Sequence, residues 1–406
     1  MNEPLVFNPL DPAFRIDPYP TYARLRAEDP VHEAQFGALV FSRYDDCLAL
    51  LRDPRSSSDG RNSTAYKEAI EQGIVDSEML IMEEPSFLFL DPPDHTRLRG
   101  LVNKAFTPRV VERLRPRIQA RVDELLDAVA EQGSLEVIED LAYPLPVAVI
   151  CELLGVPVED HATFREWSRQ AARSLDPEEA LPPEAQEQRR NVTESFRNYF
   201  RGLIAERRES PQDDLISALI AAEDEGKKLS EQELLSTCIL LLIAGHETTV
   251  NLIGNGTLAL LRNPDQLAKL RDDPSLAQSA VEEVLRYDPP VQFTGRIALE
   301  EMEVGGATLQ KGQQSVILVA SANRDGAQFP DPDRFDITRE GNQHIAFSFG
   351  IHFCLGAPLA RVEGQIALST LARRFDNLAL QTEAPEYKEN IVLRGLAALP
   401  VSFTPA

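Results

Sequence analysis

Cysteine is scarce in this chain, which has four among its 406 residues. Cys47, Cys151, Cys238 and Cys354 stand far apart, and no C-x-x-C pair or pair of neighbouring histidines accompanies them. Structural zinc sites use closely spaced cysteine and histidine ligands, so the sequence argues against a zinc site. Disulfides are rare in a reducing compartment, and we expect none here.

Long hydrophobic runs and positive charge are also lacking. The first twenty residues carry acids and prolines and resemble no secretory signal. The longest apolar stretch, residues 234–245, is too short to cross a bilayer. Lys and Arg number 41 against 65 Asp and Glu, a net charge of −24, which argues against binding to nucleic acid or to anionic membranes. We therefore expect a soluble, cytoplasmic protein.

Helical periodicity is abundant, and it covers most of the chain. We expect helices at 19–29, 44–53, around 64–72, almost continuously from about 95 to 290, and at 354–374, with a hairpin over 31–44, further strands over 291–345 and short strands at the C-terminal end. No internal repeat or linker is visible. The sequence predicts one domain over residues 1–406, mainly α with a small β region, acting as a monomer.

Cys354 differs from the other three cysteines in its surroundings. It lies in FSFGIHFCLGAPLARVE, residues 347–363, between glycines and two residues after a histidine, whereas the other three lie in apolar segments typical of buried cysteine. A cysteine can be core filler, half of a disulfide, a zinc ligand, a nucleophile or a haem ligand. The other residues of the chain have to decide between these roles.

The segment 230–262 predicts a buried central helix. Ser230 followed by Glu233 forms a capping box at its start, and the first half is apolar nearly all round. AGHETT, residues 244–249, then places a glycine, an acid and two threonines inside the apolar run. Gly245 lets something large approach the backbone, although an ordinary helix kink would also explain the motif.

Cationic side chains occur at several helical spacings around these segments. His95 and Arg99 are four residues apart, Glu283 and Arg286 are three apart, and Arg334 lies in a proline-braced loop, FPDPDRF. Each pattern alone is common on surface helices. Together they offer the donors that two carboxylates of a buried cofactor would require.

These motifs together resemble the cytochrome P450 superfamily. FSFGIHFCLGAPLAR, AGHETT, EVLR, ANRD with FPDPDRF, and DPPDHTRLR occur in that family's order and spacing over nearly the whole chain. The resemblance is to soluble bacterial members, above all to those that oxidise macrolides and other polyketides. It implies the cytochrome P450 fold, with haem b buried between the long central helix and the helix that follows the cysteine loop.

The resemblance also implies residue roles. Cys354 would ligate the haem iron as a thiolate, and Gly350 and Gly356 would let the backbone approach the porphyrin. The haem-propionate partners would be His95, Arg99, Arg296 and His352. Glu283, Arg286 and Arg334 would form a structural triad that holds the haem-binding loop. Glu247 and Thr248 match the family's acid–alcohol pair, which delivers protons to dioxygen, while His246 is expected to serve packing or a surface bond.

The implied activity is that of a monooxygenase, which inserts one atom of O2 into a C–H bond by hydroxylation or epoxidation, with electrons from a ferredoxin and its reductase. A peroxide-driven or isomerising enzyme and a non-enzymatic haem sensor are the alternatives. The family's pocket positions here are almost wholly apolar: Met82, Phe87, Leu88, Leu241, Ala244, Val291, Phe293, Ile391 and Val392. They favour a bulky hydrophobic substrate, a macrolide or polyketide before a steroid or terpenoid. Glu83 and Glu84 leave room for a cationic group.

Overall fold

A computed structural model describes residues 5–35, 37–72, 86–171, 173, 176, 181–222 and 228–405. Its contacts divide the chain into two compact units. The sheet unit comprises Met1–Gly100, Val291–Asp333 and Gln343–Cys354, and the helical unit comprises Leu101–Pro290, Arg334–Asn342 and Leu355–Ala406. The single domain over residues 1–406 that the sequence leads us to expect stays a prediction.

The sheet unit is built on a five-stranded sheet in the order β1-β2-β8-β5-β3. Its strands are β1 (Val31–Glu33), β2 (Leu39–Phe41), β3 (Ser56–Ser57), β5 (Thr294–Ala298) and β8 (Gln314–Ile317), and β6 (Met302–Val304) and β7 (Ala307–Leu309) form a separate hairpin. The expected hairpin over 31–44 is confirmed, because β1 and β2 pair antiparallel and Gly37 between them has φ +80°. β2 then pairs in parallel with β8, which carries the sheet on from the N-terminal segment to residues 291–333.

Short helices accompany this sheet. They are α1 (Pro12–Ile16), α2 (Tyr19–Glu28), α3 (Tyr44–Arg52), α4 (Thr64–Glu71), α15 (Val319–Ala322) and the 3-10 turns η1 (Gly60–Asn62), η2 (Phe87–Phe89) and η7 (Gly350–His352). Phe41, Cys47 and Ile317 lie in one core cluster of the unit. The Cys47 thiol donates to the carbonyl of Phe41 at 3.2 Å, and burial raises its pKa. Cys47 is therefore a core residue, as expected.

The helical unit holds most of the helices. They are α7 (Pro108–Asp127), α8 (Pro144–Leu154), α9 (His161–Gln170), α10 (Pro183–Glu209), α11 (Leu215–Ala221), α12 (Glu231–Arg262), α13 (Pro264–Asp272), α14 (Ala277–Tyr287) and α16 (Ala357–Arg374), with the π-helical turn η3 (Val137–Ala142) and the 3-10 turns η4 (Val158–Asp160) and η6 (Pro274–Leu276). Strands β4 (Ser134–Glu136), β10 (Pro400–Pro405) and β9 (Phe375–Leu380) form a small antiparallel sheet. Helix α6 (Asp94–Ala105) begins in the sheet unit and ends in the helical unit. Cys151 and Cys238 are buried in the helical unit, as expected.

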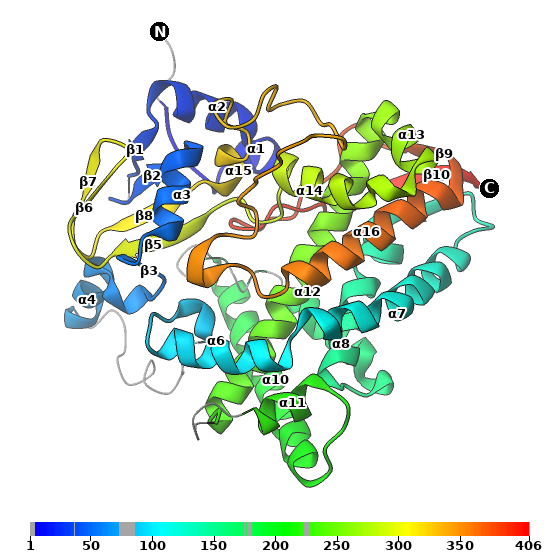
Figure 1. Ribbon diagram of the computed structural model, residues 1–406, viewed down its shortest axis with the longest axis horizontal. Helices are drawn as coiled ribbons and strands as arrows, with labels where there is room; N and C mark the ends of the chain where they lie inside the picture. The colour runs from blue at the N-terminus through cyan, green and yellow to red at the C-terminus, as the bar shows by residue number, and fades with distance from the viewer. Residues whose placement is uncertain are drawn as a thin grey trace. The chain divides into compact units, whose positions relative to one another are not determined.

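Helix α12 is the longest helix of the unit, about 48 Å over 32 residues. The predicted capping box between Ser230 and Glu233 is present at its start. α12 packs against α8, α14 and α16 (Figure 1). Among the described residues, α12 is the one helix that is long and apolar enough to cross a membrane. However, 61% of its most apolar 18-residue stretch is buried inside the protein.

Gly364 in α16 explains how these helices come so close together. A Cβ at this position would lie 3.1 Å from a methyl group of Leu252 in α12 and 3.2 Å from one of Val281 in α14. Any larger residue would therefore have to push its neighbours aside. Glycine costs about 1 kcal/mol of helix propensity at this position, and in return it lets the three helices approach closely.

Candidate functional site

The cysteine loop of the sheet unit has a constrained backbone. The Cys354 N–H donates to the carbonyl of Phe347 at 2.9 Å, and the Cys354 side chain is partly exposed. Gly350 has φ +68°, and a Cβ there would lie 2.9 Å from the carbonyl oxygen of Leu51, so only glycine fits. Ser348, with φ +62°, is a left-handed residue without that freedom. Such strain persists where the surroundings hold a functional loop in place.

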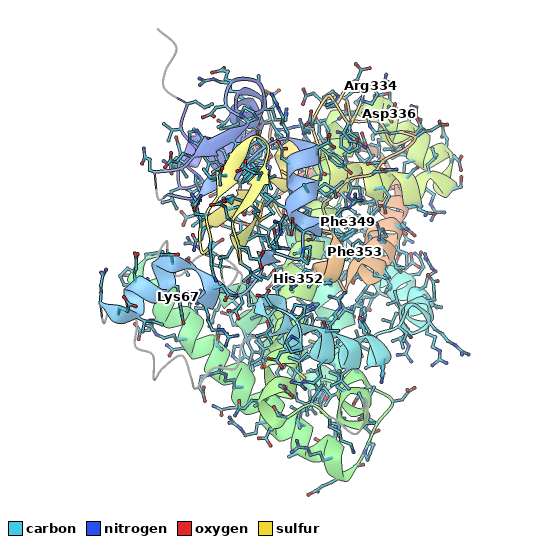
Figure 2. All side chains as sticks on the ribbon, turned by 60° about the vertical axis from the view of Figure 1, so that its left-hand side comes forward. Lys67, Arg334, Asp336, Phe349, His352 and Phe353 are labelled. Carbon is cyan, nitrogen blue, oxygen red and sulfur yellow. The ribbon has the colours of Figure 1, made fainter. Side chains whose placement is uncertain are left out.

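Basic side chains from three segments of the sheet unit gather beside this loop. His95 and Arg99 come from α6, Arg296 from β5 and His352 from the loop itself. Of these four residues, His352 is labelled in Figure 2. The rings of His95 and His352 lie 4.3 Å apart, centroid to centroid. Arg99 donates to the carbonyl of Phe353 at 2.7 Å. The four predicted propionate partners are thus brought toward one another.

The electrostatics of this cluster are those of a site for an anion. Burial, reinforced by Arg296, His95 and Arg99, lowers the pKa of His352 to about 3. Burial also lowers the pKa of Arg296 to about 10 and the pKa values of His95 and Arg99. Among the residues that the structure describes, both ring nitrogens of His95 and the Nε2 atom of His352 are buried without a hydrogen-bond partner. A neutral imidazole has one N–H, and a buried N–H that lacks a partner calls for an acceptor such as a carboxylate or phosphate oxygen.

These observations fit a haem. A haem needs a thiolate or another axial ligand, donors for two propionates and a backbone that lies close to the porphyrin. Cys354, the basic cluster and Gly350 offer these three features. Gly356 is different: it caps α16 with φ −77°, a conformation that any residue adopts, so the backbone does not explain a glycine there.

The AGHETT stretch lies on an unbroken α12 in the helical unit. The Thr248 hydroxyl donates to the carbonyl of Ala244 at 2.8 Å, and that of Thr249 donates to Gly245 at 3.2 Å. Neither bond interrupts the helix, which runs from Glu231 to Arg262. Thr248 is partly buried, one residue after a fully buried acid.

That acid, Glu247, is 1% exposed and is paired with Lys388. Its Oε1 atom lies 2.6 Å from the Lys388 ammonium, which also contacts Oδ1 of Asn251 at 3.2 Å. The other oxygen, Oε2, has no hydrogen-bond partner among the described residues and lies 3.8 Å from Nε2 of His246. Sequence reasoning missed Lys388, because 141 residues separate it from Glu247 and no spacing links them.

His246 is completely buried and does not reach the surface. Its Nδ1 atom lies 2.7 Å from the carbonyl of Leu242, which can only accept, so Nδ1 carries the proton. Nε2 then accepts from the Ser168 hydroxyl at 2.6 Å. Burial lowers the pKa of His246, so the ring is neutral. Of the two expected roles, packing with buried bonds is the one observed.

The structural triad has a different third member from the one predicted. Glu283 and Arg286 are fully buried and form two bonds of 2.8 Å. The guanidinium that completes the group belongs to Arg339, whose Nε lies 3.2 Å from both Glu283 oxygens. The Arg334 side chain is 62% exposed and lies 3.6 Å from Asp336 (Figure 2). Arg334 contributes only its carbonyl, which accepts from Arg286 and Arg339, because the loop turns its side chain to solvent.

The predicted pocket residues lie in both units and stay a prediction. In the sheet unit Phe87 is buried and Leu88 and Val291 are partly buried, while the Phe293 ring packs edge-on against Phe7 at 5.8 Å. In the helical unit the corresponding residues are Leu241 and Ala244 on α12, both partly buried, and Ile391 and Val392, buried and partly buried. Met82, Glu83 and Glu84 lie outside the described residues.

Comparisons with known proteins agree with this geometry. A sequence model described as "Cytochrome P450" matches residues 66–402. The polyketide biosynthesis cytochrome P450 PksS of Bacillus subtilis is 41% identical over 99% of this chain and 100% of its own. The 6-deoxyerythronolide B hydroxylase of Saccharopolyspora erythraea is 42% identical over 96% of each chain. The crystal structure of ligand-free CYP164A2 from Mycobacterium smegmatis superposes with a TM-score of 0.89 at 48% identity, covering 97% of this chain and 98% of that one.

Proposed function

The chain belongs to the cytochrome P450 family and is an oxidoreductase of the monooxygenase type, and from this premise we propose that it hydroxylates or epoxidises a macrolide or similar polyketide. The observation that carries the haem-thiolate part of the proposal is the basic cluster beside Cys354. Three buried imidazole nitrogens in it have no hydrogen-bond partner among the described residues. A haem-thiolate centre explains why such a cluster would surround one partly exposed cysteine.

The cofactor of the proposal is haem b, which Cys354 would hold through its thiolate, while His95, Arg99, Arg296 and His352 would donate to the propionates. Bound through a thiolate, haem supplies oxygen-activating chemistry, because the sulfur pushes electron density that favours O–O cleavage. Donors fixed at β5, α6 and the cysteine loop would hold the ring in a single orientation.

Proton delivery is the part of the reaction that we propose for α12. Oε2 of Glu247, which makes no bond to a described residue, would take protons from solvent and pass them on. The Thr248 hydroxyl, now bonded to Ala244, would position the last proton of the relay. A full acid–alcohol pair has no purpose in a haem sensor, and this pair is why we favour a monooxygenase over the alternatives.

The substrate class rests on apolar side chains and on the relatives. Phe87, Leu241, Ala244 and Ile391 offer shape and few fixed polar contacts, as suits a bulky neutral molecule. PksS and the 6-deoxyerythronolide B hydroxylase carry polyketide or macrolide chemistry in their names. Steroids and terpenoids follow in our ranking, and fatty acids come last, since no arginine is predicted in the pocket to receive a carboxylate.

Electrons would come from a ferredoxin and its reductase, because the chain shows no flavin or iron–sulfur motif. The protein would act as a monomer in the cytoplasm.

The experiment that tests the proposal is spectroscopic. The reduced protein with carbon monoxide is expected to give the absorption of a thiolate-ligated haem, and Cys354→Ala is expected to abolish it. Cys151→Ala, a buried core cysteine in the same chain, is the matched control and should leave the spectrum intact. A retained thiolate spectrum in Cys354→Ala would disprove the assignment.

The substrate class is tested on the same preparation. A macrolide, a steroid, a terpene and a long-chain fatty acid are titrated in turn, and the low- to high-spin shift of the haem is followed. Tightest binding by the macrolide, with oxidised product after turnover, is the expected result. Binding of the fatty acid alone would overturn the ranking.

A further inference from the structure

The C-terminal turn, residues 386–397, is a closed loop of the helical unit. The Lys388 N–H donates to the carbonyl of Gly395 at 3.0 Å, and the Ala397 N–H donates to that of Glu386 at 2.8 Å. A bridge between Tyr387 and Leu396 completes the pairing. Lys388 therefore lies at the base of a hydrogen-bonded turn, and its side chain extends from there.

This turn is fastened directly onto α12. A Cβ at Gly395 would lie 1.9 Å from Oδ1 of Asn251, so the backbone of the turn touches the helix side chain. Asn255, one helical turn further on, donates to the carbonyl of Arg394 at 3.1 Å. Arg394 in turn binds Asp288 at 2.9 Å. The turn is thus located relative to α12 by contacts on both sides.

Asp176 fastens the turn from a second direction. Its Oδ1 atom accepts the backbone N–H groups of Ile391 at 2.9 Å and Val392 at 3.0 Å, and its side chain is fully buried. Burial raises the pKa of Asp176, while these two backbone bonds and Arg173 oppose the rise. The Asp176 carboxylate binds the backbone of the turn, which indicates a structural role.

The consequence is a buried counter-charge for Glu247. The Lys388 side chain is 18% exposed and its ammonium contacts both Glu247 and Asn251. The titratable groups that face Glu247 are Lys388, His246 and Tyr143. His246 is neutral, and burial together with Glu247 raises the pKa of Tyr143, which keeps its hydroxyl neutral as well. Among these described groups, Lys388 alone brings positive charge to the acid.

We propose that Lys388 is a positioning residue for the proton relay: its ammonium fixes Oε1 of Glu247 and so leaves Oε2 as the oxygen that carries protons. The relay itself rests on the proposed function, but the pairing does not. An unpaired carboxylate at this depth would prefer its protonated form, and the acid would then have to release a proton unaided. In this proposal Lys388 acts on the reaction through Glu247 and not through a contact of its own with substrate or cofactor.

The test is a mutant cycle on the haem-loaded full chain, with Lys388→Met, Lys388→Arg, Glu247→Gln and the double variant Lys388→Met/Glu247→Gln. Lys311→Met, which removes an equal charge from an exposed turn, is the control. At pH 8 we expect Lys388→Met to lower the melting midpoint by about 5 °C or more, because a buried charge loses its partner. Most of that loss should disappear in the double variant, in which no carboxylate is left without its partner.

A merely structural lysine is excluded by the second readout, the pH profile of product formed per NAD(P)H consumed. Lys388→Met is expected to lower this ratio about tenfold or more at neutral pH, with a gentler loss at acid pH, while Lys388→Arg keeps the wild-type profile. Equal melting losses in Lys388→Met with and without Glu247→Gln would disprove the pairing. If the double variant restores the melting midpoint but Lys388→Met leaves the product formed per NAD(P)H unchanged, the relay role is disproved. The melting cycle requires no substrate, so it stands even if the proposed function fails.

Discussion

Glu363 is the residue whose charge state the fold controls most directly. It lies within α16, 1% exposed, and its Oε2 atom has no hydrogen-bond partner among the described residues. Burial raises its pKa to about 8, above the ordinary value of 4.5. The folded protein therefore keeps a proton at neutral pH that the unfolded chain releases.

This shift predicts how stability changes with pH. A raised folded pKa gives stability that is present below about pH 4.5 and is lost as the pH rises toward 8. Glu363→Gln mimics the protonated acid, so its stability should match the wild type near pH 4.5 and exceed it at higher pH, by roughly 5 kcal/mol above pH 8. Denaturant unfolding of both proteins from pH 4.5 to 8.5 measures the difference. Parallel curves would show that Glu363 does not bind the proton.

At the scale of elements, the loop 334–342 is anchored to α14 through buried charge. Arg339 reaches Glu283 with its guanidinium, while Arg334 offers only a carbonyl. Removing one partner from a buried ion pair leaves an uncompensated charge, whereas an exposed arginine contributes little.

We therefore expect the two arginines to differ sharply on substitution. Arg339→Met should destabilise the protein by about 1.5–3 kcal/mol and weaken haem retention, because Glu283 loses charge-assisted hydrogen bonds while its pair with Arg286 remains. Arg334→Met should stay within about 0.5 kcal/mol of the wild type. Thermal unfolding and haem content after gel filtration check both variants. The reverse order would restore Arg334 to the triad.

Local patterns predicted the elements better than the contacts between them. The capping box at Ser230 and the hairpin around Gly37 follow from residues within a few positions of each other, and both are confirmed. Cys354 could be singled out from the sequence because its glycines and histidine are local too, and its role stays a prediction. Arg339 and Lys388 were not, since nothing near them marks a partner 56 or 141 residues away. Such choices depend on which way a loop turns its side chains.

At the scale of the whole molecule, the charge of −24 would repel the acidic ferredoxin that we propose as the electron donor. Docking then depends on local basic side chains. Lys104 and Arg109 are exposed in the helical unit, whereas Arg361 is engaged by Glu282 at 2.6 and 2.9 Å. Because they are exposed, Lys104 and Arg109 are candidates for the docking surface.

Turnover supported by an acidic ferredoxin is expected to fall steeply as salt rises, because screening weakens attraction between exposed charges. Lys104→Gln/Arg109→Gln should lower the rate at low salt and flatten its salt dependence, while Lys311→Gln should do neither. Steady-state rates between about 0.02 and 0.5 M salt provide the measurement. A rate independent of salt in the wild type would exclude electrostatic docking.

The C-terminal turn constrains how this enzyme can be engineered. Ile391 and Val392, two positions predicted to meet the substrate, share one short hydrogen-bonded loop with Lys388. Libraries that vary this loop to admit new molecules will also displace the lysine that faces Glu247. Substrate selectivity and the product formed per NAD(P)H should therefore change together under directed evolution. Variants with a new substrate scope are expected to consume more NAD(P)H per product until Lys388 again contacts Glu247.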